Sequence, residues 1–126
     1  MSTSHILFTI DGPTAVLTFN RPEARNAMTW AMYDALLDAC EKVDADSAVR
    51  VFVLRGVDDG AFVAGTDISQ FPGLRTREDA LAYETRLDRV ISRLERVAKP
   101  TLAAEVTHRR LVATCLVLLP LHFRRV

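Results

Sequence analysis

Two short runs of β-forming residues open the chain, from His5 to Ile10 and from Thr14 to Phe19. Asp11-Gly12-Pro13 separates them, and glycine and proline at this spacing favour a tight reversal. The pattern therefore predicts a β-hairpin. The next segment, Asn20 to Asn26, contains Pro22, which lacks a backbone donor and restricts the residue before it. We expect this segment to be a loop.

A helical pattern follows from about Trp30 to Asp44, with Thr29 as its cap. Its apolar residues recur at helical spacing: Tyr33, Leu36, Leu37, Cys40 and Val43. The run from Arg50 to Arg55 is rich in β-branched residues and ends at Gly56. The order of strand, helix and strand predicts a parallel crossover, with this second strand buried on both faces. The chain is thus predicted to be α/β.

A second, longer helix is predicted from Arg77 to Ala98, with apolar residues on one face and charged residues on the other. We expect Lys99-Pro100 to stop this helix and Thr101 to Ala104 to begin a further short strand. Upstream of the helix, Thr66 or Asp67 carries a helix-start signal.

The composition is that of a globular domain: 126 residues, of which 49% are hydrophobic and 25% charged. Sixteen basic residues balance sixteen acidic ones, so no overall field attracts nucleic acid, and that partner is disfavoured. The segment from Met1 to Ile10 has no basic stretch followed by an apolar one. We therefore expect no secretory signal and a cytoplasmic location.

The two cysteines, Cys40 and Cys115, have no second cysteine or histidine near them at ligand spacing. They are predicted to be small apolar residues rather than a disulfide or a metal site, and no metal is expected. The longest apolar run, from Leu111 to Leu121, is eleven residues, whereas a bilayer-spanning helix needs about 20. A membrane partner is not expected, although the arginines that flank this run keep surface association as a hypothesis.

The stretch from Gly60 to Ile68 is the most informative for chemistry. Ala-Gly between a strand end and a helix start lets a ligand approach the backbone, and unpaired N–H groups there can hold an oxyanion. The alternative is that Ala64 and Gly65 are small for packing and that Asp67 is only a cap. Spacing alone leaves both interpretations open.

Four blocks of sequence, in order, resemble the enoyl-CoA hydratase/isomerase (crotonase) superfamily. They are Leu17-Thr-Phe-Asn-Arg-Pro-Glu-Ala-Arg-Asn-Ala-Met28, Val49-Arg-Val-Phe-Val-Leu-Arg-Gly56, Gly60-Ala-Phe-Val-Ala-Gly-Thr-Asp-Ile68 and Lys99-Pro-Thr-Leu-Ala-Ala104. The resemblance covers about residues 5–104. It implies the N-terminal portion of a crotonase-like β-β-α spiral, an incomplete fold, with an acyl-CoA thioester as partner.

The resemblance also implies a site in which two backbone N–H groups stabilise charge on the thioester oxygen. Thr66 matches the first of these donors. The other implied substrate or CoA contacts are Ala24, Arg25, Ala27, Ala64, Gly65, Asp67 and Ile68. Arg25 is either a phosphate contact or an exposed loop arginine, and Asp67 fits a helix cap better than a catalyst. Coenzyme A enters as part of the substrate, so no separate cofactor is expected.

The resemblance ends near Glu105. Residues 106–126 contain no acidic residue and no glycine, so we divide the chain into a crotonase-like region, 1–105, and a divergent tail, 106–126. Counting forward from Lys99 puts the second donor at about Val112 and the first catalytic glutamate at Cys115, which is no general base. A frameshift near Ala104 or Glu105 is our hypothesis, and a tail evolved for another purpose is the alternative.

The resulting functional expectation is a family protein acting on acyl-CoA thioesters, by hydration or isomerisation of 2-enoyl-CoA, with little or no activity in this chain itself. The alternative is a non-catalytic fragment that binds acyl-CoA or an intact subunit. Family relatives form homotrimers or hexamers, and most of that interface is expected to be missing here.

Overall fold

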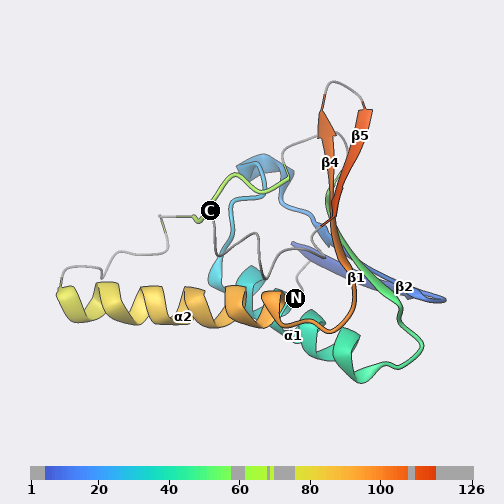
Figure 1. Ribbon diagram of the computed structural model, residues 1–126. Helices are drawn as coiled ribbons and strands as arrows, with labels where there is room; N and C mark the ends of the chain where they lie inside the picture. Colours follow the sequence, from blue (N-terminus) through green and yellow to red (C-terminus); the bar gives the residue numbers. More distant parts are fainter. Residues whose placement is uncertain (1–4, 58–61, 68, 70–75, 108–109, 116–126) are drawn as a thin grey trace.

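The computed structural model describes residues 5–57, 62–67, 69, 76–107 and 110–115, and for residues 105–107 and 110–115 it describes the backbone alone (Figure 1). Strands β1 (Ile6–Asp11) and β2 (Thr14–Phe19) pair antiparallel, with Ile6 opposite Phe19. Gly12 lies in their turn at a φ of +59°, a left-handed conformation that glycine adopts without steric cost. The predicted hairpin is confirmed.

Two crossovers follow the hairpin. Helix α1 (Trp30–Ala45) joins β2 to the parallel strand β3 (Val51–Gly56), and Thr29 caps it by accepting a hydrogen bond from the Met32 N–H at 3.2 Å. Helix α2 (Arg77–Glu95) then precedes β4 (Thr101–Thr107), which pairs parallel to β3. Both helices and both strands were predicted, but α2 ends three residues before Ala98, the predicted end. The Arg96 N–H closes its last turn by donating to the carbonyls of Ser92 and Arg93.

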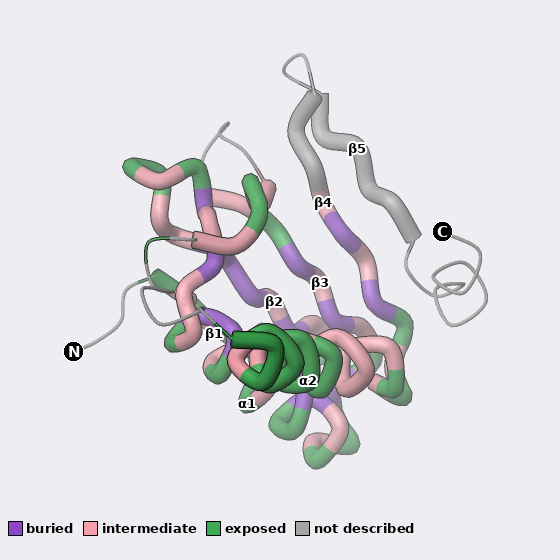
Figure 2. The backbone as a smooth tube through the Cα atoms, turned by 90° about the vertical axis from the view of Figure 1, so that its left-hand side faces the viewer, coloured by how far each residue is buried: buried purple, intermediate pink, exposed green. Residues whose placement is uncertain are grey.

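The sheet has five strands in chain order, β1-β2-β3-β4-β5, and both helices cover one of its faces (Figures 1 and 2). Parallel crossovers are almost always right-handed, and these two step across the sheet in the same direction, so their helices lie on the same side. The core forms between that face and α1, with Val90 of α2 added. Its largest fully buried side chains are Phe52, Leu17, Met32, Val43, Val49, Val90, Asn26 and Cys40.

The expectation that β3 is buried on both faces is wrong. Phe52 and Leu54 point into the core and are buried, whereas Val51 and Val53 on the opposite face are half-buried. The physical reason is the one-sided arrangement of α1 and α2, since a parallel strand is fully buried only where helices cover both faces.

Strand β5 (Arg110–Cys115) was not predicted from the sequence. It pairs antiparallel with β4, so that Val112 lies opposite Glu105 and Cys115 opposite Leu102. The division of the chain after residue 105 falls within β4 and stays a prediction. In the part of the chain that the structure describes, no helix has both the length and the apolarity needed to cross a membrane.

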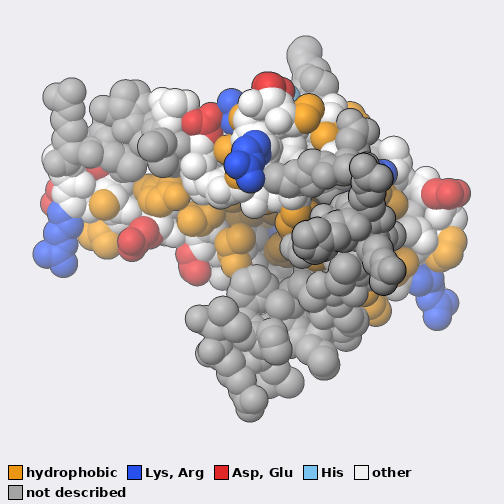
Figure 3. Space-filling view, turned by 90° about the horizontal axis from the view of Figure 1, so that it is seen from above, with side chains coloured by type: hydrophobic (Ala, Val, Ile, Leu, Met, Phe, Trp, Pro, Cys, Tyr) orange, Lys and Arg blue, Asp and Glu red, His pale blue; other side chains and the backbone are white. Residues whose placement is uncertain are grey.

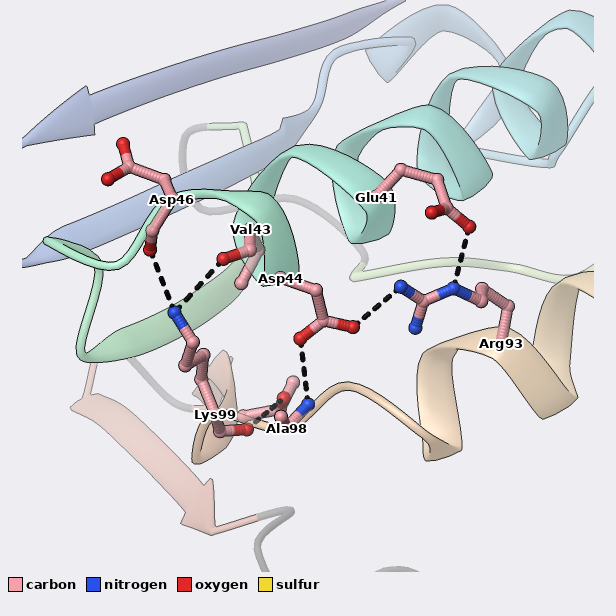
Figure 4. A network of polar contacts seen from close by, with 8 residues as sticks. Glu41, Val43, Asp44, Asp46, Arg93, Ala98 and Lys99 are labelled. Atoms are coloured by element: carbon pink, nitrogen blue, oxygen red, sulfur yellow. Dashed lines mark hydrogen bonds and ion pairs between the residues drawn. The ribbon is translucent and has the colours of Figure 1, made fainter.

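A polar network fastens the end of α1 to α2 and to the start of β4 (Figure 4). The Lys99 ammonium donates to the carbonyls of Val43, Asp46 and Val49 at 3.1, 2.9 and 2.8 Å. A cation is favourable there because the last carbonyls of a helix lack partners and carry its negative dipole end.

Arg93 adds the contact between the two helices. Its guanidinium donates to Glu41 at 2.7 Å and to Asp44 at 2.6 Å, and these two hydrogen bonds raise the Arg93 pKa. Asp44 also accepts from the Ala98 N–H at 2.9 Å. The start of β4 is therefore fixed through α1.

Helix α2 covers the core with only its C-terminal half. Val90 is its buried residue, while Leu81, nearer its start, is 50% exposed. Seen from above, hydrophobic side chains stay exposed between charged ones on the side to which α2 projects (Figure 3). Arg86, in the middle of α2, joins the helix to α1. Its guanidinium lies 4.3 Å from the centroid of the Trp30 ring and forms an ion pair with Asp34 at 3.1 Å.

Candidate functional site

The candidate site lies where the parallel strands β2 and β3 end. Phe19 and Gly56 are register partners at the carboxyl ends of these strands. The segment 20–29 leaves from the first, and the chain toward 62–67 leaves from the second. Ligands of α/β sheets bind beyond the carboxyl ends of parallel strands, so this edge is where a site is expected.

The first segment folds back sharply after the short 3-10 helix η1 (Pro22–Ala24). Arg25 and Asn26 are both left-handed, with φ values of +54° and +60°. Asn26, which is 1% exposed, holds this turn: its Oδ1 accepts from the Arg21 N–H at 2.7 Å, and its Nδ2 donates to the Phe62 carbonyl at 3.1 Å. Because two polar groups depend on one buried amide, this side chain defines the shape of the loop.

Backbone hydrogen bonds join the two segments directly. The Ala64 N–H donates to the Arg25 carbonyl at 3.1 Å, and the Met28 N–H donates to the Gly65 carbonyl at 2.7 Å. The Asp67 N–H donates to the Met28 carbonyl at 2.9 Å. Gly65 has a φ of +123°, which side-chain-bearing residues rarely adopt. The structure thus brings the predicted residues Arg25, Ala64, Gly65 and Asp67 to one place.

Within the part of the chain that the structure describes, this pairing leaves the Thr66 N–H without a hydrogen-bond acceptor. Met28 and Thr66 form an isolated parallel bridge in which the residues on either side of Thr66 bond to Met28. In such a bridge the N–H of the central residue faces the opposite side. Among the described residues, the Thr66 N–H forms no hydrogen bond. Extended backbone pairing leaves this donor available, and Thr66 itself lies in a bridge rather than in a helix.

The Thr66 side chain is fixed to α1. Its Oγ1 lies 2.6 Å from the hydroxyl of Tyr33, and either hydroxyl can be the donor. Tyr33 is 6% exposed, and burial raises the pKa of its phenol. The phenol therefore stays protonated at neutral pH and keeps its proton for hydrogen bonding.

Asp67 is held in its ionised form. Its Oδ1 accepts from the Ser69 N–H at 2.9 Å and from the Ser69 hydroxyl at 2.6 Å, while its Oδ2 accepts from Arg21 at 2.8 Å. The bonds from Ser69, followed by the bond from Arg21, lower the pKa of Asp67 to about 2. Such a carboxylate carries no proton to donate at neutral pH and is a weak base, and its role as a helix cap stays a prediction.

The remaining predicted residues have simpler surroundings. Ala24 and Ala27 face each other across the turn, with the Ala27 N–H donating to the Ala24 carbonyl at 3.0 Å. The Arg25 side chain is exposed, and within the described ranges it forms no ion pair. Ile68 lies outside the described residues. Across the described residues no group of three or more histidine, cysteine or acidic side chains is arranged to hold a metal ion.

Sequence reasoning missed the residues that hold the site together: Arg21, Asn26 and Tyr33. Arg21 and Asn26 lie in the block from Leu17 to Met28 that carries the family resemblance, but the resemblance did not assign a role to either side chain. Asparagine also tolerates left-handed backbone better than most residues, which hints at the turn. Tyr33 left no signal, because it fits the apolar stripe of α1.

A model of the family described as enoyl-CoA hydratase/isomerase matches residues 9–106, which include both segments of the site. The chain belongs to this family. The short-chain-enoyl-CoA hydratase of Clostridium acetobutylicum is 32% identical over 104 residues, covering 82% of this chain and 40% of that protein. The mitochondrial 3-hydroxyisobutyryl-CoA hydrolase of Danio rerio is 38% identical over 65 residues, covering 52% of this chain and 17% of that protein.

The solved structure of an enoyl-CoA hydratase/carnithine racemase from Magnetospirillum magneticum superposes with a TM-score of 0.75 at 34% identity, covering 82% of this chain and 39% of that one. The fold of this enoyl-CoA hydratase/isomerase family member is therefore the crotonase-like α/β fold that was predicted, in its N-terminal portion. The chain spans about 40% of the length of the hydratase from Clostridium acetobutylicum.

Proposed function

We propose that this site binds the thioester group of an acyl-CoA, with the Thr66 N–H donating to the thioester oxygen. The observation that carries the proposal is the Thr66 N–H, which the bridge to Met28 turns away from Met28 and which forms no hydrogen bond with any described residue. A fixed backbone donor polarises the thioester carbonyl and stabilises the negative charge that an enolate places on its oxygen. Because the donor is a main-chain group, threonine supplies it as well as alanine does.

Two further features support an acyl-CoA ligand. Ala64 and Gly65 have little or no side chain, so the pantetheine arm can approach the backbone beside the donor. Arg25, whose carbonyl bonds to Ala64, carries an exposed guanidinium that suits a CoA phosphate. Coenzyme A would arrive as part of the substrate.

Hydration or isomerisation of 2-enoyl-CoA is the reaction proposed for a complete site of this kind. The residues of this chain supply binding and polarisation. Asp67, beside the donor, is held ionised by Ser69 and Arg21, so at neutral pH it has no proton to donate and is a weak base. The counted positions of the second donor and the catalytic glutamate hold Val112 and Cys115, both in β5. We therefore propose acyl-CoA binding without turnover for the chain as it stands.

The test compares two ligands that differ in the thioester oxygen. Calorimetric titration of the full chain with butyryl-CoA and with the thioether S-butyl-CoA separates recognition of the thioester carbonyl from recognition of the alkyl chain and the CoA portion. Replacing the Thr66 amide by an ester, through the α-hydroxy analogue of threonine, removes the N–H and keeps the side chain. We expect this change to weaken butyryl-CoA binding by about fivefold, the value of one hydrogen bond near 1 kcal/mol, and to leave S-butyl-CoA binding unchanged.

Thr66→Ser is the matched control, because it keeps both the N–H and the hydroxyl and is expected to bind both ligands as the unchanged chain does. The absence of saturable butyryl-CoA binding, or an equal weakening of both ligands by the ester, contradicts the proposal.

A further inference from the structure

The Tyr33 and Thr66 hydroxyls connect the core to the proposed donor. Tyr33 is the more rigid partner, because it lies in the buried cluster and its N–H continues α1 by donating to the Thr29 carbonyl at 3.0 Å. Its ring also packs on Trp30, with centroids 5.6 Å apart. Thr66, in contrast, lies in the segment 62–67, which backbone hydrogen bonds and the Arg21–Asp67 ion pair hold against the segment 20–29.

The orientation of the peptide group between Gly65 and Thr66 sets the direction in which the Thr66 N–H points. This planar group carries both the Gly65 carbonyl, bonded to the Met28 N–H at 2.7 Å, and the Thr66 N–H on its other side. Gly65 has a φ of +123°, and nothing lies within 4 Å of the place that a Cβ would take, so no side chain at this position restrains the plane. Hydrogen bonds from Met28 to Gly65 and from Asp67 to Met28 hold the backbone on either side of Thr66, but neither of them is made by Thr66 itself.

The bond of 2.6 Å between Thr66 Oγ1 and the Tyr33 hydroxyl is a further restraint, and it acts on the side chain of Thr66 itself. On this geometry, we infer that Tyr33 is a positioning residue that sets the direction of the Thr66 N–H through the Thr66 hydroxyl. The inference rests on the proposed function, in which that N–H meets the thioester oxygen. It also gives the threonine side chain a role that the N–H alone does not require.

The test measures how rigid and how well aimed the donor is. In the full chain, the ¹⁵N order parameter of the Thr66 amide is expected to be near the rigid value of about 0.85 and to fall below about 0.6 in Tyr33→Phe. Thr66→Val, which keeps the N–H and removes the hydroxyl, is expected to behave as Tyr33→Phe does. Tyr83→Phe removes the hydroxyl of a second ring that packs on Trp30, with centroids 5.4 Å apart, but keeps the Tyr33 hydroxyl, and it is expected to leave the value unchanged.

The second readout is the infrared stretch of bound butyryl-CoA labelled with ¹³C at the thioester carbonyl. Polarisation by Thr66 lowers this frequency in the unchanged chain, and we expect Tyr33→Phe and Thr66→Val to lose at least half of that shift. Thr66→Ser, which keeps a hydroxyl, is expected to retain it.

The outcomes separate the two ideas. An unchanged Thr66 order parameter in Tyr33→Phe overturns the positioning role whether or not the ligand binds. A chain that shows the expected loss of rigidity but no binding of butyryl-CoA refutes the proposed function and leaves the mechanical link between Tyr33 and Thr66 standing.

Discussion

Arg21 and Asp67 form an ion pair at 2.8 Å across 46 positions of the chain, with side chains only 19% and 17% exposed. The same Arg21 nitrogen also donates to the Ala27 carbonyl at 2.9 Å. One cation therefore closes the first loop of the site on itself and ties it to the residue that follows the proposed donor. The position of Thr66 is therefore expected to depend on the negative charge of Asp67, the next residue in the chain.

Protonation of Asp67 is expected to destabilise the protein in acid. Its pKa is lowered from 3.8 to about 2 on folding, so the ionised form stabilises the folded state above about pH 4, and this contribution is lost as the pH falls to 2. In urea unfolding from pH 7 to pH 2, we expect Asp67→Asn to be less stable than the unchanged chain at neutral pH, with the difference closing below pH 4. Asp38→Asn, at a side chain that is 69% exposed, is the control and should track the unchanged chain.

Removal of the Asn26 amide is expected to be costly. Asn26→Ala leaves the Arg21 N–H and the Phe62 carbonyl without their partner in a buried place and keeps a left-handed backbone that alanine tolerates poorly. We expect a loss of about 3 kcal/mol in the free energy of unfolding. Asn26→Asp retains the acceptor for Arg21 alone, so an intermediate loss is expected; equal stability of all three chains would contradict this account of the turn.

The three carbonyls that accept hydrogen bonds from Lys99 indicate that its ammonium group stabilises the folded protein. Lys99→Met preserves much of the aliphatic stem but removes the hydrogen bonds to Val43, Asp46 and Val49. We expect a loss of about 2 kcal/mol in urea unfolding. Lys42→Met, at an exposed lysine of the same helix end, is the comparison and should change stability by less than about 0.5 kcal/mol.

Cys40 is expected to be chemically inert in the folded protein. Burial raises the pKa of its thiol to about 12, so about one molecule in ten thousand carries a thiolate at pH 8. In a Cys115→Ser chain, we expect a disulfide reagent such as Ellman's to label no thiol in native buffer and one thiol in denaturing urea. Stoichiometric labelling of the native chain within minutes would show that Cys40 is accessible.

Turnover is the property that we expect the chain not to show. Purified protein incubated with 2-butenoyl-CoA should lose enoyl-thioester absorbance no faster than buffer does, since the counted positions of the second donor and the catalytic glutamate hold Val112 and Cys115. Hydration that disappears when the Thr66 amide is replaced by an ester would prove this expectation wrong.

Local patterns were sufficient to predict most of the fold. Two β-forming runs around Asp11-Gly12-Pro13 predicted the hairpin of β1 and β2, because the turn residues act locally. Helical periodicity predicted α1 and α2, because it records which side of a helix meets the core. The burial of β3 could not be judged in this way, since it depends on the side of the sheet to which distant helices return. Strand β5 was missed because Arg110–Cys115 shows little alternation and is defined by its pairing with β4.

The site was predictable to a different degree. The family resemblance led to Thr66 and to the two segments around it, and the structure places those segments against each other. The roles of the individual residues stay predictions. The contacts that shape the site, Tyr33 to Thr66 and Arg21 to Asp67, join residues 33 and 46 positions apart. Pairs of polar side chains at such separations leave no periodic trace in a sequence.

The pairing of Phe19 with Gly56 has a consequence for how the donor is placed. Both site segments start from this pair, so their relative position follows the alignment of β2 on β3. A slip of one residue between these strands would move one segment past the other by about 3.3 Å and turn the core-facing side chains of one strand outward. A displacement of that size exceeds the length of a hydrogen bond. The packing of Leu17 against Leu54, register partners buried in the core, thereby sets the position of the Thr66 N–H.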